Sequence, residues 1–221
     1  MPCRPPRRTF WPRSSRIEPV SRIRQGEPAD GRSAYGSQYD HWTMVRHVER
    51  LVSDVASERA LGPDHLVIEV ASNDGYLLKH YNARGVPVLG IEPAKNIAPV
   101  AEKNGVRTRC EFFGQACASQ LASEGLKADV FHANNVLAHV ADLNGFVEGI
   151  RTVLKPTGVA VIEAPQAKEM IKKLEFDTIY HEHLCYFSLT ALKALFARHK
   201  LKLRHVEELN IHGGSLRLFA V

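Results

Sequence analysis

Hydrophobic residues recur along most of this chain in two alternating patterns, short apolar runs and stretches with helical spacing. Val48, Leu51 and Val55 repeat with a helical period, which predicts an amphipathic helix over residues 41–60. After it, the two patterns alternate to the end of the chain. The predicted strands cover residues 65–71, 87–91, 106–113, 129–133, 159–164, 201–208 and 214–221. The further predicted helices cover residues 75–84, 96–104, 115–124, 140–154 and 188–199.

Repeated strand–helix units predict a doubly wound α/β fold. Their crossovers are right-handed and place helices on both faces of a mostly parallel sheet. No helix separates the last two predicted strands, so the final strand is expected to enter antiparallel. Ligands of such sheets bind beyond the carboxyl ends of the strands. The residues that follow each strand are therefore the candidates for function.

Composition and charge divide the chain into a tail and a body. The 221 residues are 44% hydrophobic and 24% charged, as in a globular protein with a sizeable core. Residues 1–32 hold eight arginines, three acids and six of the twelve prolines, and we expect this extension to be mostly disordered. The folded domain is expected over residues 33–221, where 21 basic and 21 acidic residues balance. Such a neutral body argues against nucleic acid as a partner.

Two further classes are disfavoured by what the sequence lacks. No run of eighteen apolar residues is present, so we expect no membrane-spanning helix. The four cysteines include no CxxC pair, so we expect neither a disulfide scaffold nor a metal site. This cysteine usage favours a reducing compartment, the cytoplasm.

The turn after the first predicted strand has the wrong residues for a dinucleotide loop. Ala71 and Asn73 stand where a GxGxxG fingerprint requires glycine, and only Gly75 remains. Glu69 and Asp74 add negative charge, which suits a cationic ligand or one with an ammonium group. A tight turn with a helix cap at Asn73 or Asp74 is the alternative interpretation.

Polar residues also end the second and fourth predicted strands. Glu92 lies 23 positions after Glu69, a spacing at which an acidic residue accepts hydrogen bonds from ribose hydroxyls. Asn134 and Asn135 follow the fourth strand, where two amides could hold a polar ligand or cap a turn. Glu69 and Glu92 together, at this spacing, favour an adenosine ligand.

A cluster of titratable residues lies between the fifth long strand and the next helix. It comprises Tyr180, His181, Glu182 and His183. Histidine is the usual general base near neutral pH, so acid–base chemistry is the favoured interpretation. A packed structural cluster ranks second. Metal binding ranks third, because the HxH pair has no third ligand nearby.

Six segments in the same order resemble the sugar C-methyltransferases, class I S-adenosylmethionine (SAM) enzymes that methylate a carbon of a nucleotide-linked keto-deoxysugar. They are residues 69–78, 90–94, 112–114, 133–140, 176–183 and 212–217. The resemblance covers the SAM-dependent methyltransferase domain only. It implies that the zinc domain usual at the start of the family is lost or replaced here, and that the usual carboxy-terminal domain is missing.

The resemblance also implies a cofactor, SAM, and residues that hold it. Residues 69–75 would bind its methionyl part and Glu92 its ribose. Phe112 and Phe113 would surround the adenine, and Asn134 would lie at the cofactor's edge.

For the small-molecule substrate, a keto-sugar, the resemblance implies a lining of Tyr180, Glu182, His183 and His139. His183, oriented by Glu182, would remove the acidic proton beside the ketone, and Tyr180 or His139 would stabilise the enolate oxygen. Two alternatives stay open: a catalytically impaired SAM-binding remnant of the family, and an NAD-dependent sugar oxidoreductase.

Overall fold

One sheet of seven strands forms the centre of the described structure. The computed structural model describes residues 41–221, and their side chains from residue 44. The extension predicted over residues 1–32 lies outside the described residues. The strands are β1 (Val67–Val70), β2 (Val88–Ile91), β3 (Thr108–Arg109), β4 (Ala128–Asn134), β5 (Leu154–Pro165), β6 (Leu203–Leu209) and β7 (Ser215–Ala220).

The strand order is β3-β2-β1-β4-β5-β7-β6. The pairs from β3 to β5 are parallel, and β7 runs antiparallel to both β5 and β6. The prediction of a doubly wound, mostly parallel sheet with a final antiparallel strand is therefore confirmed. The last strand inserts between two earlier ones instead of adding at the edge.

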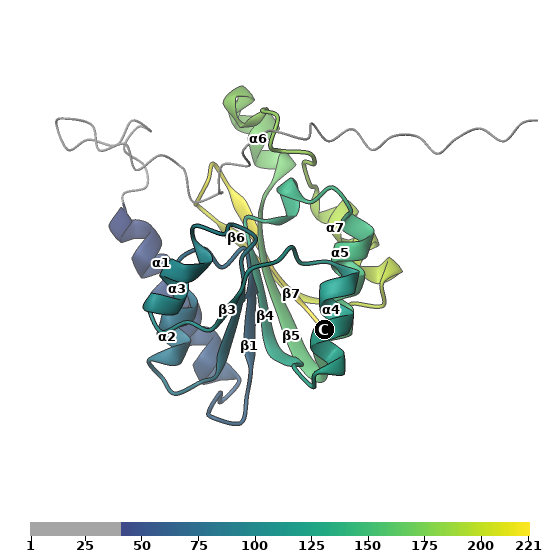
Figure 1. The fold of residues 1–221 in the computed structure, drawn as a ribbon. Coiled ribbons are helices and arrows are strands. Elements are labelled where there is room, and N and C mark those ends of the chain that lie inside the picture. The colour runs from purple at the N-terminus through teal and green to yellow at the C-terminus, as the bar shows by residue number, and fades with distance from the viewer. Residues whose placement is uncertain (1–40) are drawn as a thin grey trace, which may run out of the picture.

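Helices cover both faces of this sheet (Figure 1). The helices α1, α2 and α3 lie on one face, α4, α5 and α7 on the other, and α6 lies beyond the carboxyl end of β5. They are α1 (His41–Glu58), α2 (Leu78–Asn82), α3 (Ala98–Lys103), α4 (Gln115–Ser123), α5 (Leu143–Val153), α6 (Ala167–Lys173) and α7 (Leu189–Arg198), with the 3₁₀ turns η1 (Leu137–His139) and η2 (Phe176–Thr178).

Alternate residues of each central strand belong to two separate cores. Val67 and Val161 pack under α1 and α2, whereas their neighbours Ile68 and Ile162 pack under α4 and α5. Because both faces are buried, a central strand such as β2 is apolar along its whole length. No helix among residues 41–221 is long and apolar enough to cross a membrane.

Several elements differ from the sequence-based prediction. Strand β3 covers only Thr108–Arg109, whereas a strand was predicted over residues 106–113. Helix α6 was not predicted, because its seven residues are too few for a clear helical period and none of them is buried. Strand β5 begins at Leu154, ahead of the predicted start, with a register shift against β4. Helix α2 begins at Leu78 instead of residue 75, because the preceding residues form a turn with left-handed backbone.

Candidate active site

The turn after β1 has an unusual backbone that brings it onto β2. Ala71, Asn73 and Gly75 alternate along it with φ of 51°, 51° and 80°. The Asn73 side chain donates to the Ala71 carbonyl over 2.8 Å. Non-glycine residues reach this left-handed region at a cost, and such strain concentrates at functional sites. The two positions that lack a fingerprint glycine therefore still adopt glycine-like conformations.

Glu92 is held in this turn by backbone amides. The Asn73 amide donates to its Oε2 over 3.0 Å and the Ala94 amide to its Oε1 over 2.8 Å. Burial raises the pKa of Glu92, and these two hydrogen bonds oppose that rise. The structure thus joins the ends of β1 and β2 through one carboxylate. Each of its oxygens has a lone pair left for a ligand hydroxyl.

Glu69 is a second buried acid at the same edge. Its side chain belongs to a residue that is 1% exposed, and its Oε2 has no hydrogen-bond partner within the described part of the chain. Burial raises the pKa of Glu69 well above its usual value, and the negative charges of Asp74 and Glu92 raise it further. A buried acceptor without a partner indicates a ligand group that completes it.

Two amides at the end of β4 share this feature. The Oδ1 atoms of Asn134 and Asn135 are buried and have no partner within residues 41–221. Asn135 adopts a φ of 56°, and its amide donates to the Glu163 carbonyl of β5 over 2.8 Å. The ends of β1, β2 and β4 therefore present carboxylate and amide oxygens at one edge.

The two phenylalanines expected near the adenine lie in different surroundings. Phe112 is 69% exposed. The ring of Phe113 packs into the core, with its centroid 5.1 Å from that of Phe131 and 5.3 Å from that of Phe146. Phe112 is therefore the one available to a ligand from solvent.

The loop after η2 brings the predicted catalytic cluster together. His183 Nδ1 lies 2.9 Å from the Thr178 carbonyl and its Nε2 lies 3.1 Å from the Tyr180 hydroxyl. A carbonyl can only accept, so Nδ1 carries the proton and Nε2 keeps a lone pair. The His139 ring centroid lies 5.0 Å from that of His183. His183 is thus arranged to accept a proton at Nε2.

The expectation that Glu182 orients His183 is wrong. The Thr178 carbonyl takes that place, and the Glu182 carboxylate lies 3.8 Å from His181 Nε2 instead. The backbone of Glu182 contributes differently, because its carbonyl accepts from His139 Nδ1 over 3.0 Å. Burial lowers the pKa of His139 and the nearby His183 lowers it further, which favours a neutral ring.

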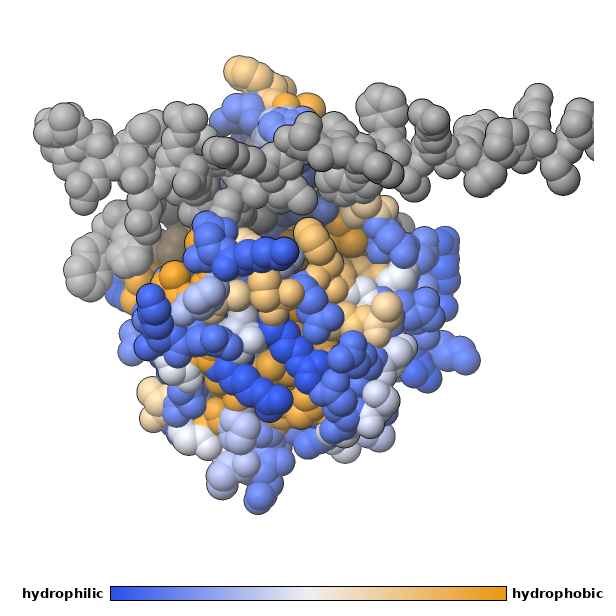
Figure 2. Space-filling view, viewed as in Figure 1, coloured by the Kyte–Doolittle hydropathy of each residue, from blue (hydrophilic) through white to orange (hydrophobic). Residues whose placement is uncertain are grey.

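Backbone contacts fix this loop against the rest of the edge. The Leu184 amide donates to the Ala138 carbonyl of η1 over 2.8 Å, which ties the loop to the segment after β4. Apolar side chains just before this loop are exposed: Leu174, at the end of α6, is 80% exposed and Phe176 of η2 is 82% exposed. Figure 2 shows hydrophobic side chains in this part of the surface, over α6.

No metal site is found among the described residues. No three His, Cys, Asp or Glu side chains among them lie close enough together to hold a metal ion.

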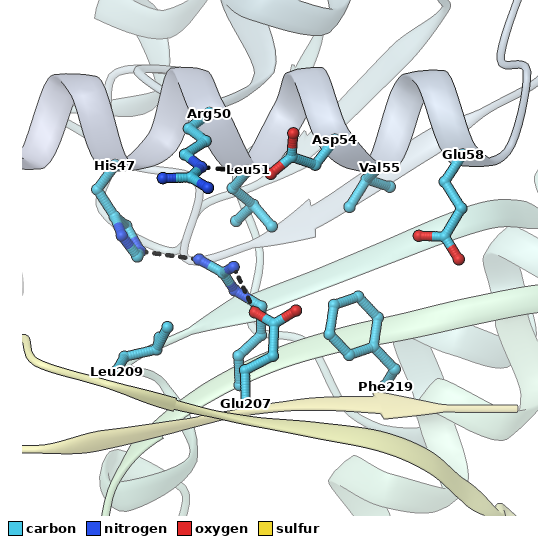
Figure 3. Close-up of a pocket in the computed structure, with 10 residues that line it drawn as sticks. His47, Arg50, Leu51, Asp54, Val55, Glu58, Glu207, Leu209 and Phe219 are labelled. Atoms are coloured by element: carbon cyan, nitrogen blue, oxygen red, sulfur yellow. Dashed lines mark hydrogen bonds and ion pairs between the residues drawn. The ribbon is translucent and has the colours of Figure 1, made fainter.

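Sequence reasoning missed a buried ionic network beside the site. Arg217 of β7 donates from Nε to Glu163 of β5 and from Nη1 to Glu207 of β6, each over 2.8 Å. His47 of α1 lies 3.0 Å from Glu163. The network borders a pocket of about 350 Å³ between α1 and the β6–β7 pair (Figure 3). The acids and bases lie on four separate elements, so no sequence spacing signals it.

His132 of β4 is a second buried group that the sequence did not reveal. Its Nε2 lies 2.9 Å from the Tyr81 hydroxyl. Burial lowers the pKa of His132 to about 3, so its ring is neutral at any ordinary pH. It fills the core beside Glu69, its neighbour on β1.

The fold and the polar edge define the protein as a Rossmann-like class I methyltransferase domain. Residues 41–206 match the family described as the methyltransferase domain, and the chain belongs to this family.

Curated relatives and solved structures agree with this assignment. C-methyltransferase NovU of Streptomyces niveus is 34% identical over 181 residues, which is 82% of this chain and 43% of the relative. A ubiquinone biosynthesis O-methyltransferase of Bartonella tribocorum is 27% identical over 43% of this chain and 39% of the relative. The chain thus spans less than half the length of these relatives.

The magnesium protoporphyrin IX methyltransferase of Synechocystis PCC 6803, solved with bound SAH, shares the fold. Its TM-score is 0.62 at 14% identity, and the match covers 84% of this chain and 89% of that one.

Proposed function

We propose that the edge formed by β1, β2 and β4 binds SAM. The supporting observation is a set of buried oxygens that lack partners among residues 41–221, Glu69 Oε2 and Asn134 Oδ1, beside Glu92, which two backbone amides hold. A carboxylate edge suits the ammonium group of SAM, and Glu92 is placed for its ribose hydroxyls. Solved relatives of the same fold carry SAM or SAH.

Calorimetry tests this proposal directly. One SAM should bind per chain, and NADH should not compete. Glu92→Ala should weaken SAM binding by about 1–3 kcal/mol, the usual cost of losing a charged acceptor. The matched control is Glu102→Ala, which removes an exposed acid from α3 and should leave the affinity unchanged. Equal affinity for SAM in the wild type and Glu92→Ala would remove Glu92 from the ribose site.

We further propose that the chain methylates the carbon next to the ketone of a nucleotide-linked deoxysugar. The observation that carries this proposal is the lone pair of His183 Nε2, which the hydrogen bond from Nδ1 to the Thr178 carbonyl leaves unprotonated and which accepts from the Tyr180 hydroxyl. NovU, the relative with 34% identity, is a C-methyltransferase. A base paired with a hydroxyl is the arrangement that enolate chemistry requires.

The residues would act in a defined order. SAM, when bound, supplies an electrophilic methyl group. His183 Nε2 removes the proton beside the ketone, and the electron pair of that C–H bond delocalises onto the ketone oxygen as an enolate. The Tyr180 hydroxyl, which points at His183 Nε2 in this structure, must turn its hydrogen to the enolate oxygen. His139, which lies beside His183, is the second candidate donor to that oxygen.

Exchange of the substrate proton with solvent deuterium tests the base. With candidate nucleotide-linked 4-keto sugars, the wild type should exchange the proton on the carbon beside the ketone. His183→Asn should slow exchange and methylation about 10²–10⁴-fold, the usual contribution of general-base catalysis. SAM affinity should not change. The control His181→Asn alters a side chain that is 89% exposed in the same loop and should exchange normally. Exchange that ignores His183 contradicts the assignment.

A further inference from the structure

Glu69 and Glu92, the two buried acids at the ends of β1 and β2, differ in the hydrogen bonds that their carboxyl oxygens accept. Both oxygens of Glu92 accept a backbone amide. Glu69 Oε2 accepts nothing within the described residues, and the charges that act on Glu69 are those of two acids, Asp74 and Glu92. A buried carboxylate without donors or a counter-ion is strongly disfavoured in its ionised form. The ionised form of Glu69 is therefore strongly disfavoured when no ligand is bound.

The groups that face Glu69 provide no positive charge. Asp74 and Glu92 are acids on the same edge. Tyr76 and Tyr81 of the α2 side are neutral hydroxyls, and the negative charge of Glu69 helps to raise their pKa values. His132, the neighbour on β4, has its pKa lowered to about 3 by burial and is neutral.

We propose that Glu69 holds a proton in the ligand-free protein and releases it to solvent when the α-ammonium group of SAM binds beside it. This inference rests on the proposed SAM binding and deepens it. The balance is simple: a neutral carboxylic acid loses one proton, and the resulting carboxylate pairs with the ligand's cation. An opposite charge within a few ångströms favours the ionised acid, which reverses the effect of burial. The raised pKa of Glu69 supports the same assignment.

Proton release is measured by titrating SAM calorimetrically at one pH in two buffers of different ionisation enthalpy. A pH between 6 and 7 keeps the α-amino group of the ligand protonated, since such groups titrate near 7.7–8.0. SAM and SAH both carry the ammonium group and should each release close to one proton. Methylthioadenosine lacks the amino acid part, so it should bind without proton release.

Variants separate Glu69 from its neighbours. Glu69→Gln keeps the size of the side chain but cannot ionise, so SAM binding should become independent of buffer. Glu92→Gln should bind SAM more weakly and still release the proton. If Glu69→Gln does not fold, infrared difference spectra of the wild type replace it. The C=O band of a protonated carboxyl should disappear when SAM binds.

Each outcome is decisive. Binding of SAM with the same heat in both buffers, or proton release that persists in Glu69→Gln, overturns this inference and leaves the proposed function intact. Absence of SAM binding to the wild type overturns the proposed function and this inference with it. Equal release with methylthioadenosine shows that the ammonium group is not the trigger, and also overturns it.

Discussion

Replacement of Arg217 should destabilise this domain, because it breaks a buried ion pair. Its guanidinium contacts Glu163 and Glu207 over 2.8 Å each, and only 10% of its side chain is exposed. The Glu163 side chain is 1% exposed. Arg217→Met keeps much of the apolar bulk but leaves Glu163 buried with His47 as its only remaining partner in the described network.

The expected loss follows from the cost of an uncompensated buried charge. Removal of one partner of a buried ion pair typically costs about 3–5 kcal/mol. We therefore expect Arg217→Met to lower the free energy of unfolding by about 3 kcal/mol or more at pH 7. Glu207→Gln is the control. The Glu207 side chain is 36% exposed, so solvent screens its pair with Arg217, and the loss should stay below about 1 kcal/mol.

The loss should also depend on pH. Burial opposes ionisation of Glu163, but the His47 hydrogen bond and the Arg217 charge outweigh it and lower its pKa. A lowered folded-state pKa contributes stability above the unfolded pKa, near 4.5, and loses it as pH falls through the folded value. Without Arg217 this pKa rises, so the difference between variant and wild type should shrink from pH 7 to pH 4.

Urea unfolding followed by circular dichroism at both pH values measures the effect. The double variant Glu163→Gln/Arg217→Met removes the charge together with its partner. It should recover part of the loss, with a coupling energy of about 1–3 kcal/mol. A loss below 1 kcal/mol for Arg217→Met at pH 7, or an equal loss at pH 4, would refute the reasoning.

Three further predictions concern the turn and the core beneath it. Gly75→Ala should destabilise by about 1–3 kcal/mol more than Gly85→Ala, as measured by urea unfolding, because both have positive φ but only the new Cβ at Gly75 lies 2.7 Å from a valine side chain. Tyr81→Phe should cost about 1–3 kcal/mol, since it leaves His132 Nε2 buried without its partner, whereas Tyr186→Phe at an exposed site should cost little. Because the pKa of His132 is near 3 in the folded chain, only the unfolded chain binds a proton at this residue between about pH 3 and 6.5. The free energy of unfolding should therefore rise with pH over that range. His132→Asn should flatten this rise, as measured by thermal or urea unfolding.

The pattern of apolar residues along the chain was sufficient to predict the architecture of the sheet and its helices. Apolar runs such as residues 87–91 predict strands buried on both faces, and the alternation with helices predicts parallel crossovers. The absence of a helix between the last two strands predicts the antiparallel end, as β7 shows. The sequence also placed Glu69 and Glu92 at the edge of the sheet, because both acids stand at the carboxyl ends of predicted strands.

Only the tertiary structure decided contacts between segments far apart in the sequence. The partner of His183 Nδ1 is a backbone carbonyl, and every residue has one, so the sequence could not favour Thr178 over Glu182. The Glu163–Arg217 pair forms across two adjacent antiparallel strands, and its existence depends on the insertion of β7 between β5 and β6. The burial that shifts the pKa values of Glu69 and His132 likewise arises from packing on both faces of the sheet, a property of the assembled layers and not of any local segment.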